Sequence, residues 1–213
     1  AMGAGSNGFV LKRPTLERIL PHLRFLRFNF SGGERNRYAS IMGVPQAFYD
    51  IVIQNIKDGM DIIKRDSLGC SLNMQLVCHT DDFDQILPFA RLAAEIAPVY
   101  AVIKHCSEGD SGQLGVDYDK YARAEDDLKE AEEIGKRAGV RIAIKWNRIN
   151  SKCGRSYSRC YGPQFQLQVS GSGQLAPCGL RFNTKFASTA IGNICRTRFK
   201  DLWASDRYKE VMG

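Results

Sequence analysis

Strand-like and helix-like stretches alternate along the first part of the chain, and this order constrains the fold more than any other feature of the sequence. Strands are predicted where aromatic and branched residues gather, at 23–30, 71–78, 98–106 and 140–146. Helices are predicted where apolar residues recur at threes and fours, at 44–65, 82–96 and 122–138. Strands separated by helices are typical of a parallel α/β sheet, in a barrel or an open sheet. Since a complete eight-stranded barrel takes about 250 residues, four strands predict part of a (β/α) barrel.

The sequence changes character near residue 147, where Ser, Gly, Cys and Arg become frequent and long periodic segments end. Residues 164–178 alternate polar and apolar side chains around a Ser-Gly-Ser-Gly turn, which predicts a β-hairpin. A short amphipathic helix is predicted over 199–212. We therefore expect two domains, a partial (β/α) barrel over 1–146 and a small Cys-rich module over 147–213.

Composition limits the compartment and the partners. The chain of 213 residues is 44% hydrophobic and 25% charged, as in ordinary globular proteins. Its formal net charge of +7 is spread along the chain rather than gathered in a basic tract, which argues against nucleic acid as a partner. No apolar run approaches the roughly 20 residues of a membrane-spanning helix, and the first residues lack a secretory signal. We expect a cytoplasmic protein without membrane contact, whose seven cysteines are reduced thiols or metal ligands.

Four of the seven cysteines fall in the last 61 residues, and they are Cys153, Cys160, Cys178 and Cys195. Thiolates from a folded-back hairpin can converge on one metal centre, as iron–sulfur clusters and zinc both require. Alternatively, they are small buried hydrophobes, because free cysteine is among the most buried residue types. The polar stretch Ser-Lys-Cys-Gly-Arg-Ser-Tyr-Ser-Arg-Cys-Tyr-Gly around the first two favours metal ligation, whereas the absence of a Cys-x-x-Cys pair argues against a zinc ribbon.

From residue 160 onward the sequence resembles the auxiliary-cluster module of radical S-adenosylmethionine (SAM) enzymes, the SPASM or twitch domain. The motifs that carry the resemblance occur in the family's order, namely Cys160, the hairpin, Pro177-Cys178, Gly192-Asn193-Ile194 and Trp203-Ala204-Ser205. The resemblance implies a [4Fe–4S] auxiliary cluster with ligands at Cys153, Cys160 and Cys178. Cys195 is a fourth candidate in a one-cluster twitch arrangement, or alternatively a packing residue.

The first half resembles the later part of the radical SAM partial barrel. Ser6-Asn7-Gly8 stands where the family has Thr-Asn-Gly, and the Ser31-Gly32-Gly33 turn stands where a strand ending in Ser-x-Asp-Gly is usual. SAM and substrate lie at the carboxyl ends of the strands in such barrels. The candidate cofactor-binding residues at these ends are Asn29, Ser31, Gly32, Lys104 and His105. We expect Ser31, Lys104 and His105 to line one cleft, although strand ends are commonly polar simply because they emerge into solvent.

The Cys-x-x-x-Cys-x-x-Cys motif that defines the family is absent, because no three cysteines have that spacing. The resemblance places this motif upstream of residue 1 and further cysteines beyond Gly213. The chain is therefore expected to be an internal piece or a degenerate member, unable to cleave SAM alone.

Three functions remain open from the sequence. The first is a portion of a radical SAM enzyme that binds an auxiliary cluster and contributes the substrate side of the barrel, for a peptide or small-molecule substrate. The second is a non-catalytic zinc or iron–sulfur module that engages a protein or an anionic partner. The third is a barrel enzyme with inert cysteines. Because missing early strands would leave residues 24–30 unpaired, we also expect a homodimer through that uncovered edge.

Overall fold

The computed structural model describes residues 2–108, 114–150 and 160–212. These residues form two compact units, which are described separately: the N-terminal unit, 2–108 with 114–150, and the C-terminal unit, 160–212. Within these described ranges, every helix is too short or too polar to cross a membrane.

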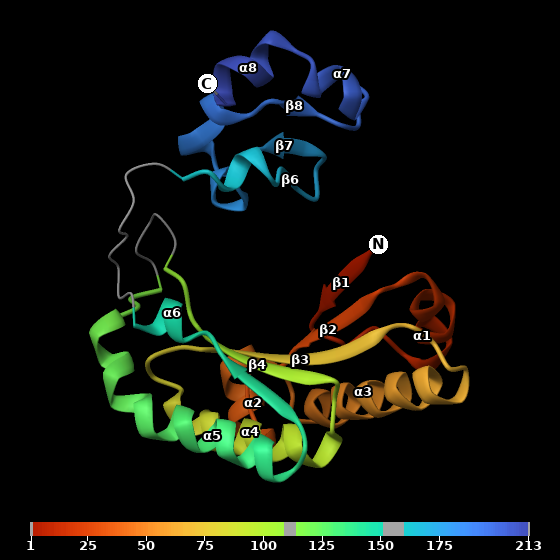
Figure 1. Ribbon diagram of the computed structural model, residues 1–213, viewed down its shortest axis with the longest axis vertical. Coiled ribbons are helices and arrows are strands. Elements are labelled where there is room, and N and C mark those ends of the chain that lie inside the picture. The colour runs from red at the N-terminus through yellow and green to blue at the C-terminus, as the bar shows by residue number, and fades with distance from the viewer. Residues whose placement is uncertain (1, 109–113, 151–159, 213) are drawn as a thin grey trace. The chain divides into compact units, whose positions relative to one another are not determined.

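The N-terminal unit is built on a five-stranded parallel sheet (Figure 1). The strands are β1 (Gly3–Ser6), β2 (Phe25–Asn29), β3 (Ser71–Cys78), β4 (Tyr100–His105) and β5 (Arg141–Ile144). Each strand pairs with the next one along the chain, so the order in the sheet equals the order in the sequence. This order differs from that of an open doubly wound sheet, where the strand order reverses at a switch point. It is the order of strands in the wall of a (β/α) barrel.

Helices connect the strands and cover one face of the sheet (Figure 1). The α-helices are α1 (Arg13–Ile19), α2 (Arg35–Met42), α3 (Ala47–Arg65), α4 (Ile86–Ile96), α5 (Glu125–Arg137) and α6 (Trp146–Ile149). Short 3-10 turns are η1 (Leu20–His22), η2 (Phe83–Gln85) and η3 (Tyr118–Ala124). Helix α5 begins with acidic and ends with basic side chains, which suits the helix dipole.

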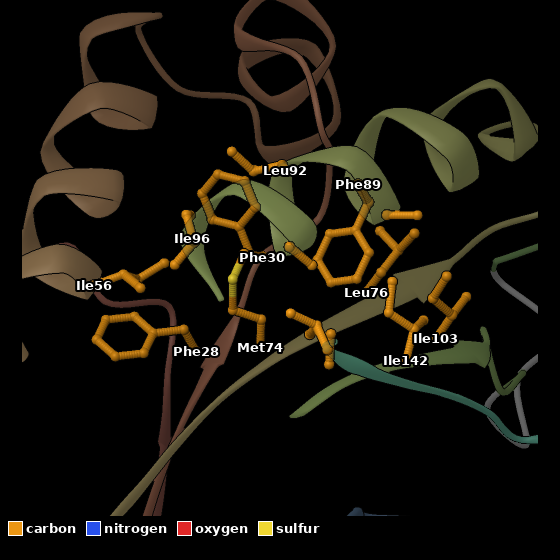
Figure 2. Packing of buried hydrophobic residues seen from close by; sticks show 14 of the residues in the cluster. Phe28, Phe30, Ile56, Met74, Leu76, Phe89, Leu92, Ile96, Ile103 and Ile142 are labelled. Carbon is orange, nitrogen blue, oxygen red and sulfur yellow. The ribbon is translucent and has the colours of Figure 1, made fainter. Parts of the chain in front are cut away.

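The core lies between the sheet and these helices. Alternate residues of each strand point to it, such as Phe28 from β2, Met74 from β3 and Ile103 from β4, and they meet Phe89 of α4 and Ile56 of α3 (Figure 2). All five side chains are fully buried. The alternate apolar side chains of the strands face the helices. The side chains between them therefore lie on the opposite face of the sheet.

The sequence prediction missed the first strand. Residues 3–6 read Gly-Ala-Gly-Ser, which has low strand propensity, yet they pair in parallel with β2 over its first four residues. The expectation that residues 24–30 form an unpaired edge is therefore wrong, because β1 pairs with β2. The reason for expecting a dimer through this strand is removed. The helices α1 and α2 were also not predicted. The four predicted strands and three predicted helices are confirmed, β3 with the predicted bounds and the others with shifted ends.

The C-terminal unit holds a three-stranded antiparallel sheet. Its elements are η4 (Gly162–Gln164), β6 (Gln168–Val169), β7 (Gln174–Ala176), η5 (Gly179–Arg181), η6 (Thr184–Thr189), β8 (Gly192–Asn193), α7 (Phe199–Trp203) and α8 (Asp206–Met212). The predicted hairpin is present, and Gly173 supplies the positive φ of +83° that its turn requires. The single closing helix that the sequence predicted is divided in two, because the Ser205 hydroxyl accepts from the Tyr208 N–H and begins α8.

Candidate cofactor-binding sites

The loop that follows β2 is fixed by a buried glutamine. The Oε1 atom of Gln85, which is fully buried, accepts hydrogen bonds from the backbone N–H groups of Gly33 at 3.0 Å and Glu34 at 3.2 Å. The Tyr49 hydroxyl donates to the Gly33 carbonyl oxygen at 3.0 Å. The backbone of Ser31 to Glu34 is thus held at the carboxyl end of the sheet by side chains from η2 and α3. Ser31 and Gly32 were expected here from the sequence. Gln85 was not, because its role depends on a contact across 52 positions.

Glycine is required at the centre of this loop. A Cβ atom on Gly33 would lie 2.1 Å from the Pro88 backbone carbon and 2.2 Å from the Phe89 nitrogen. No side chain fits at this distance, because two backbones meet there. The loop is therefore packed against the start of α4, and it presents a fixed backbone rather than an adaptable one.

An arginine reinforces the same contact from the outside. Arg37 of α2 donates from Nε to Asp84 Oδ2 at 2.7 Å and from Nη2 to Asp82 Oδ1 at 3.0 Å. Hydrogen bonding by Arg37 lowers the pKa of Asp84, whereas burial raises the pKa of Asp82 despite the same guanidinium. These pairs join the start of α2 to η2, the two segments that enclose the loop.

Asn29 and Gln75 form a polar pair in adjacent strands. The Gln75 Nε2 group donates to Asn29 Oδ1 at 3.0 Å, and the two residues are directly paired in the β2–β3 register. Both point to the face of the sheet opposite the helices. The preceding residues in the two strands, Phe28 and Met74, face the core, and consecutive strand residues point to opposite faces. Asn29, an expected ligand, is therefore on that face.

Lys104 and His105 do not share a face, and the expectation that both line one cleft is wrong. They are consecutive in β4, and consecutive strand residues point to opposite sides. His105 is buried on the helix side, where its ring lies 5.7 Å from that of Tyr118 and 6.1 Å from that of Tyr121. Lys104 is half-buried on the other side. The carboxyl ends of parallel strands lie at one edge of the sheet, but two consecutive residues of one strand still point to opposite faces.

The cysteines of the N-terminal unit have the character of structural thiols. Burial raises the pKa of Cys70, Cys78 and Cys106, so that each is protonated at neutral pH. The Tyr121 hydroxyl donates to the Cys78 carbonyl oxygen at 2.6 Å and accepts from the Cys106 N–H at 2.9 Å. Through these two hydrogen bonds, Tyr121 links η3 to the backbone of Cys78 and Cys106 at the ends of β3 and β4.

In the C-terminal unit, the hairpin sets where each cysteine lies. Cys178 comes two residues after β7 ends, at the open end of the hairpin, and is half-buried. Cys160 is exposed and precedes the η4 turn, which comes before β6 in the chain. Cys195 is exposed at the opposite end, beside the hairpin turn, where a Cβ on Gly173 would lie 2.5 Å from its Sγ. The strand β7 therefore separates Cys195 from Cys178.

The predicted ligand Cys153 lies outside the described residues. Cys160, Cys178 and Cys195 are free thiols. Across 2–108, 114–150 and 160–212, no three or more His, Cys, Asp or Glu side chains are grouped closely enough to hold a metal ion. The chemistry of these donors fits an iron–sulfur cluster, because thiolates are the protein ligands of such clusters.

Comparison with known proteins identifies the class of the C-terminal unit. Residues 160–212 match the family model of SPASM, described as an iron-sulfur cluster-binding domain. Among curated proteins, none matches the sequence.

The fold of the whole chain is shared with solved structures. One is native anSMEcpe with bound AdoMet, at 13% identity and a TM-score of 0.64, covering 98% of this chain and 57% of that chain. Another is Streptococcus suis SuiB bound to S-adenosylmethionine, at 16% identity and a TM-score of 0.70, covering 99% of this chain and 50% of that chain. A third is SuiB bound to precursor peptide SuiA, at 14% identity and a TM-score of 0.66, covering 99% of this chain and 49% of that chain. The chain spans about half the length of these proteins.

The predicted resemblance to radical SAM proteins of the SPASM class is confirmed by the family model for the C-terminal unit and by the shared fold for nearly the whole chain. The predicted fold class is confirmed too. The parallel sheet, with its helices on one face, is part of a (β/α) barrel, and a SPASM domain follows it.

Proposed function

We propose that this chain is the substrate side and the auxiliary-cluster module of a radical SAM enzyme. The observation that carries the proposal is the match of residues 160–212 to an iron–sulfur cluster-binding domain, in which the free thiols Cys160 and Cys178 precede and follow the hairpin along the chain. The SAM-cleaving cluster would be held by residues outside this sequence, so this chain alone would not cleave SAM.

We assign the auxiliary cluster to Cys153, Cys160 and Cys178, as a single [4Fe–4S] cluster in a twitch-like arrangement. The hairpin supports this assignment, since Cys160 precedes it and Cys178 follows it closely along the chain. Cys195 is the weaker candidate, because it lies beside the hairpin turn. When bound, such a cluster would supply electron relay or substrate coordination. The free thiols suit a reducing compartment, and we place the protein in the cytoplasm.

We assign SAM to the loop at the carboxyl end of β2, with Ser31, Gly32 and the backbone that Gln85 holds. Ligands of barrels bind at the carboxyl ends of strands, and Gln85 and Tyr49 hold this loop in a fixed position there. Two solved structures of the same fold contain S-adenosylmethionine. A peptide substrate is favoured over a small molecule, because another of these structures was solved with a precursor peptide.

The proposal is tested by anaerobic reconstitution of the chain with iron and sulfide. We expect a brown protein with broad visible absorbance that contains iron and sulfide in equal amounts. Cys160→Ser and Cys178→Ser should each lose most of the iron, whereas the matched control Cys195→Ser should retain it. A colourless protein that retains zinc would instead support a non-catalytic metal module, and iron loading that survives the loss of Cys160 and Cys178 would contradict the assigned ligands.

A further inference from the structure

The two faces of the small sheet in the C-terminal unit carry different side chains. Leu175 of β7 is fully buried in the small core, and a Cβ on Gly192 of β8 would lie 2.5 Å from the Leu202 side chain, so this face packs on α7. Alternate strand residues point to the opposite face. Gln168 of β6 and Ala176 of β7 lie on that opposite face, where they are directly paired in the register.

Cys178 lies on the same face as Gln168. It comes two residues after Ala176, and its backbone is extended, with φ of −152° and ψ of 143°. Residues two apart in an extended segment point to the same side, so Cys178 follows Ala176 on this face. In an antiparallel pair, a long side chain reaches the residue two positions beyond its direct cross-strand partner. Gln168 and Cys178 are diagonal neighbours of this kind, and both are half-buried.

Gly179 leaves room for the carboxamide of Gln168. A Cβ on Gly179 would lie 2.2 Å from the Oε1 atom of Gln168 and 3.9 Å from its Nε2 atom. The φ of Gly179 is not in the left-handed region, so glycine is favoured here by space and not by backbone conformation. The Gln168 carboxamide therefore lies against the residue that directly follows Cys178.

The N–H groups of Gln168 are available as hydrogen-bond donors. Among residues 2–108, 114–150 and 160–212, no side chain or backbone group accepts a hydrogen bond from the Gln168 carboxamide. A glutamine carries two such N–H donors, and a thiolate sulfur is a hydrogen-bond acceptor. Hydrogen bonds to the sulfurs are among the features that set the reduction potential of an iron–sulfur cluster.

We propose that Gln168 is a positioning residue for the auxiliary cluster, whose Nε2 group donates a hydrogen bond to the Cys178 sulfur and raises the reduction potential of the cluster. The inference rests on the proposed function, because Cys178 is one of the ligands assigned there. A donor beside the sulfur stabilises the additional negative charge of the reduced state, so its loss disfavours reduction.

The test is an anaerobic redox titration with dithionite on the full chain reconstituted with iron and sulfide, with iron content measured in every sample. Gln168→Met keeps the length of the side chain and removes its N–H donors. We expect this variant to retain its iron and to disfavour the reduced state about tenfold, which is about 59 mV for one electron. The matched control is Gln174→Met, because Gln174 is also half-buried but pairs with Asn193 beside the hairpin turn. It should leave the potential unchanged.

A second variant moves the carboxamide without removing it. The new Cβ of Gly179→Ala would displace Oε1 of Gln168, and we expect the potential to fall in the same direction. The double variant should lose no more than Gln168→Met alone, because both changes break one contact.

The iron content separates the two ways in which this test can fail. Additive shifts, an unchanged potential in Gln168→Met, or loss of iron from that variant would overturn the inference and leave the proposed function intact. An unmodified chain that takes up no iron would contradict the proposed function and the inference together.

Discussion

The two units of this chain are stabilised in different ways. In the N-terminal unit one continuous cluster of buried side chains runs from α1 to α6 between the sheet and its helices. In the C-terminal unit, over residues 160–212, the buried cluster consists of Leu175, Ile191 and Leu202, with three partly buried side chains against it. Strands there are two or three residues long, whereas β3 has eight.

The smaller buried cluster of the C-terminal unit explains why cysteines gather there. A module of about 50 residues buries too little apolar surface to offset the conformational entropy of folding, and small domains of this kind are commonly cross-linked by metals or disulfides. The N-terminal unit needs no such cross-link. Among its described cysteines, Cys70 and Cys78 are buried thiols and Cys106 is half-buried. A bound cluster would supply the missing stability, because metal binding to an otherwise weakly folded module is folding free energy.

The largest expected effect tests this difference directly. Replacing Cys160 and Cys178 together by Ser should unfold the C-terminal unit and leave the N-terminal unit folded, since structural metals contribute on the order of 10 kcal/mol to small domains. Limited proteolysis of the iron-loaded protein measures this as rapid cleavage beyond residue 160 with a stable N-terminal fragment. Cys195→Ser is the matched control and should leave the pattern unchanged. A double variant that resists the protease would show that the C-terminal unit folds without metal.

The next effect compares the two cores. Phe89→Ala in α4 should cost the N-terminal unit about 3–5 kcal/mol, and Leu175→Ala in β7 should cost the C-terminal unit about 2–5 kcal/mol. Each unit contains one tryptophan, Trp146 and Trp203, so variants with the other replaced by Phe report the urea unfolding of one unit at a time. We expect each alanine to move only the transition of its own unit. A shift of both transitions together would mean that the units unfold as one.

How far the sequence predicts this structure also differs between the units. The strands β2 to β5 and the helices α3 to α5 were predictable, because the apolar residues within each of them recur with the period of a strand or a helix. The strand β1 was not, since Gly-Ala-Gly-Ser becomes a strand only through pairing with β2. In the C-terminal unit the hairpin was predictable from its turn, and the order of motifs correctly indicated the class.

At the candidate sites, the sequence predicted positions at the ends of strands but not contacts between distant residues. Ser31 and Gly32 were expected at the end of a strand because a Gly-rich turn follows it, and their role in binding a cofactor stays a prediction. Gln85 looks in sequence like any polar residue at a helix start. The error at His105 has a simple cause, because strand alternation reverses the face at each residue. Gln168 gave no signal alone, and its relation to Cys178 exists only in the register of the folded hairpin.

A third prediction concerns the loop that the N-terminal unit holds with its own side chains. Gln85→Met keeps the size of the side chain but leaves the Gly33 and Glu34 N–H groups without their acceptor, which should cost about 1–3 kcal/mol. Urea unfolding followed at Trp146 measures the loss. Gln54→Met is the control, because Gln54 is exposed on α3 and its side chain donates to half-buried Asp58 within the same helix. If both variants were equally stable, the loop would be held by packing alone.

The smallest effect comes from the surface charges around that loop. Arg37 lowers the pKa of Asp84 below its ordinary 3.8. A lowered carboxyl pKa contributes stability that is present above the unfolded pKa and is lost as the pH falls through the folded one. Because the Asp84 side chain is 51% exposed, solvent screening limits this contribution to below about 1 kcal/mol. We therefore expect Arg37→Gln to lower the stability of the N-terminal unit slightly at pH 7, with the difference from wild type shrinking below pH 4 in urea titrations read at Trp146. The control is the same comparison in an Asp84→Asn background. There most of the pH-dependent difference in stability should vanish, leaving the part due to Asp82. If the difference in stability did not depend on pH in either background, the effect of Arg37 would come from packing of its aliphatic stem instead of its charge.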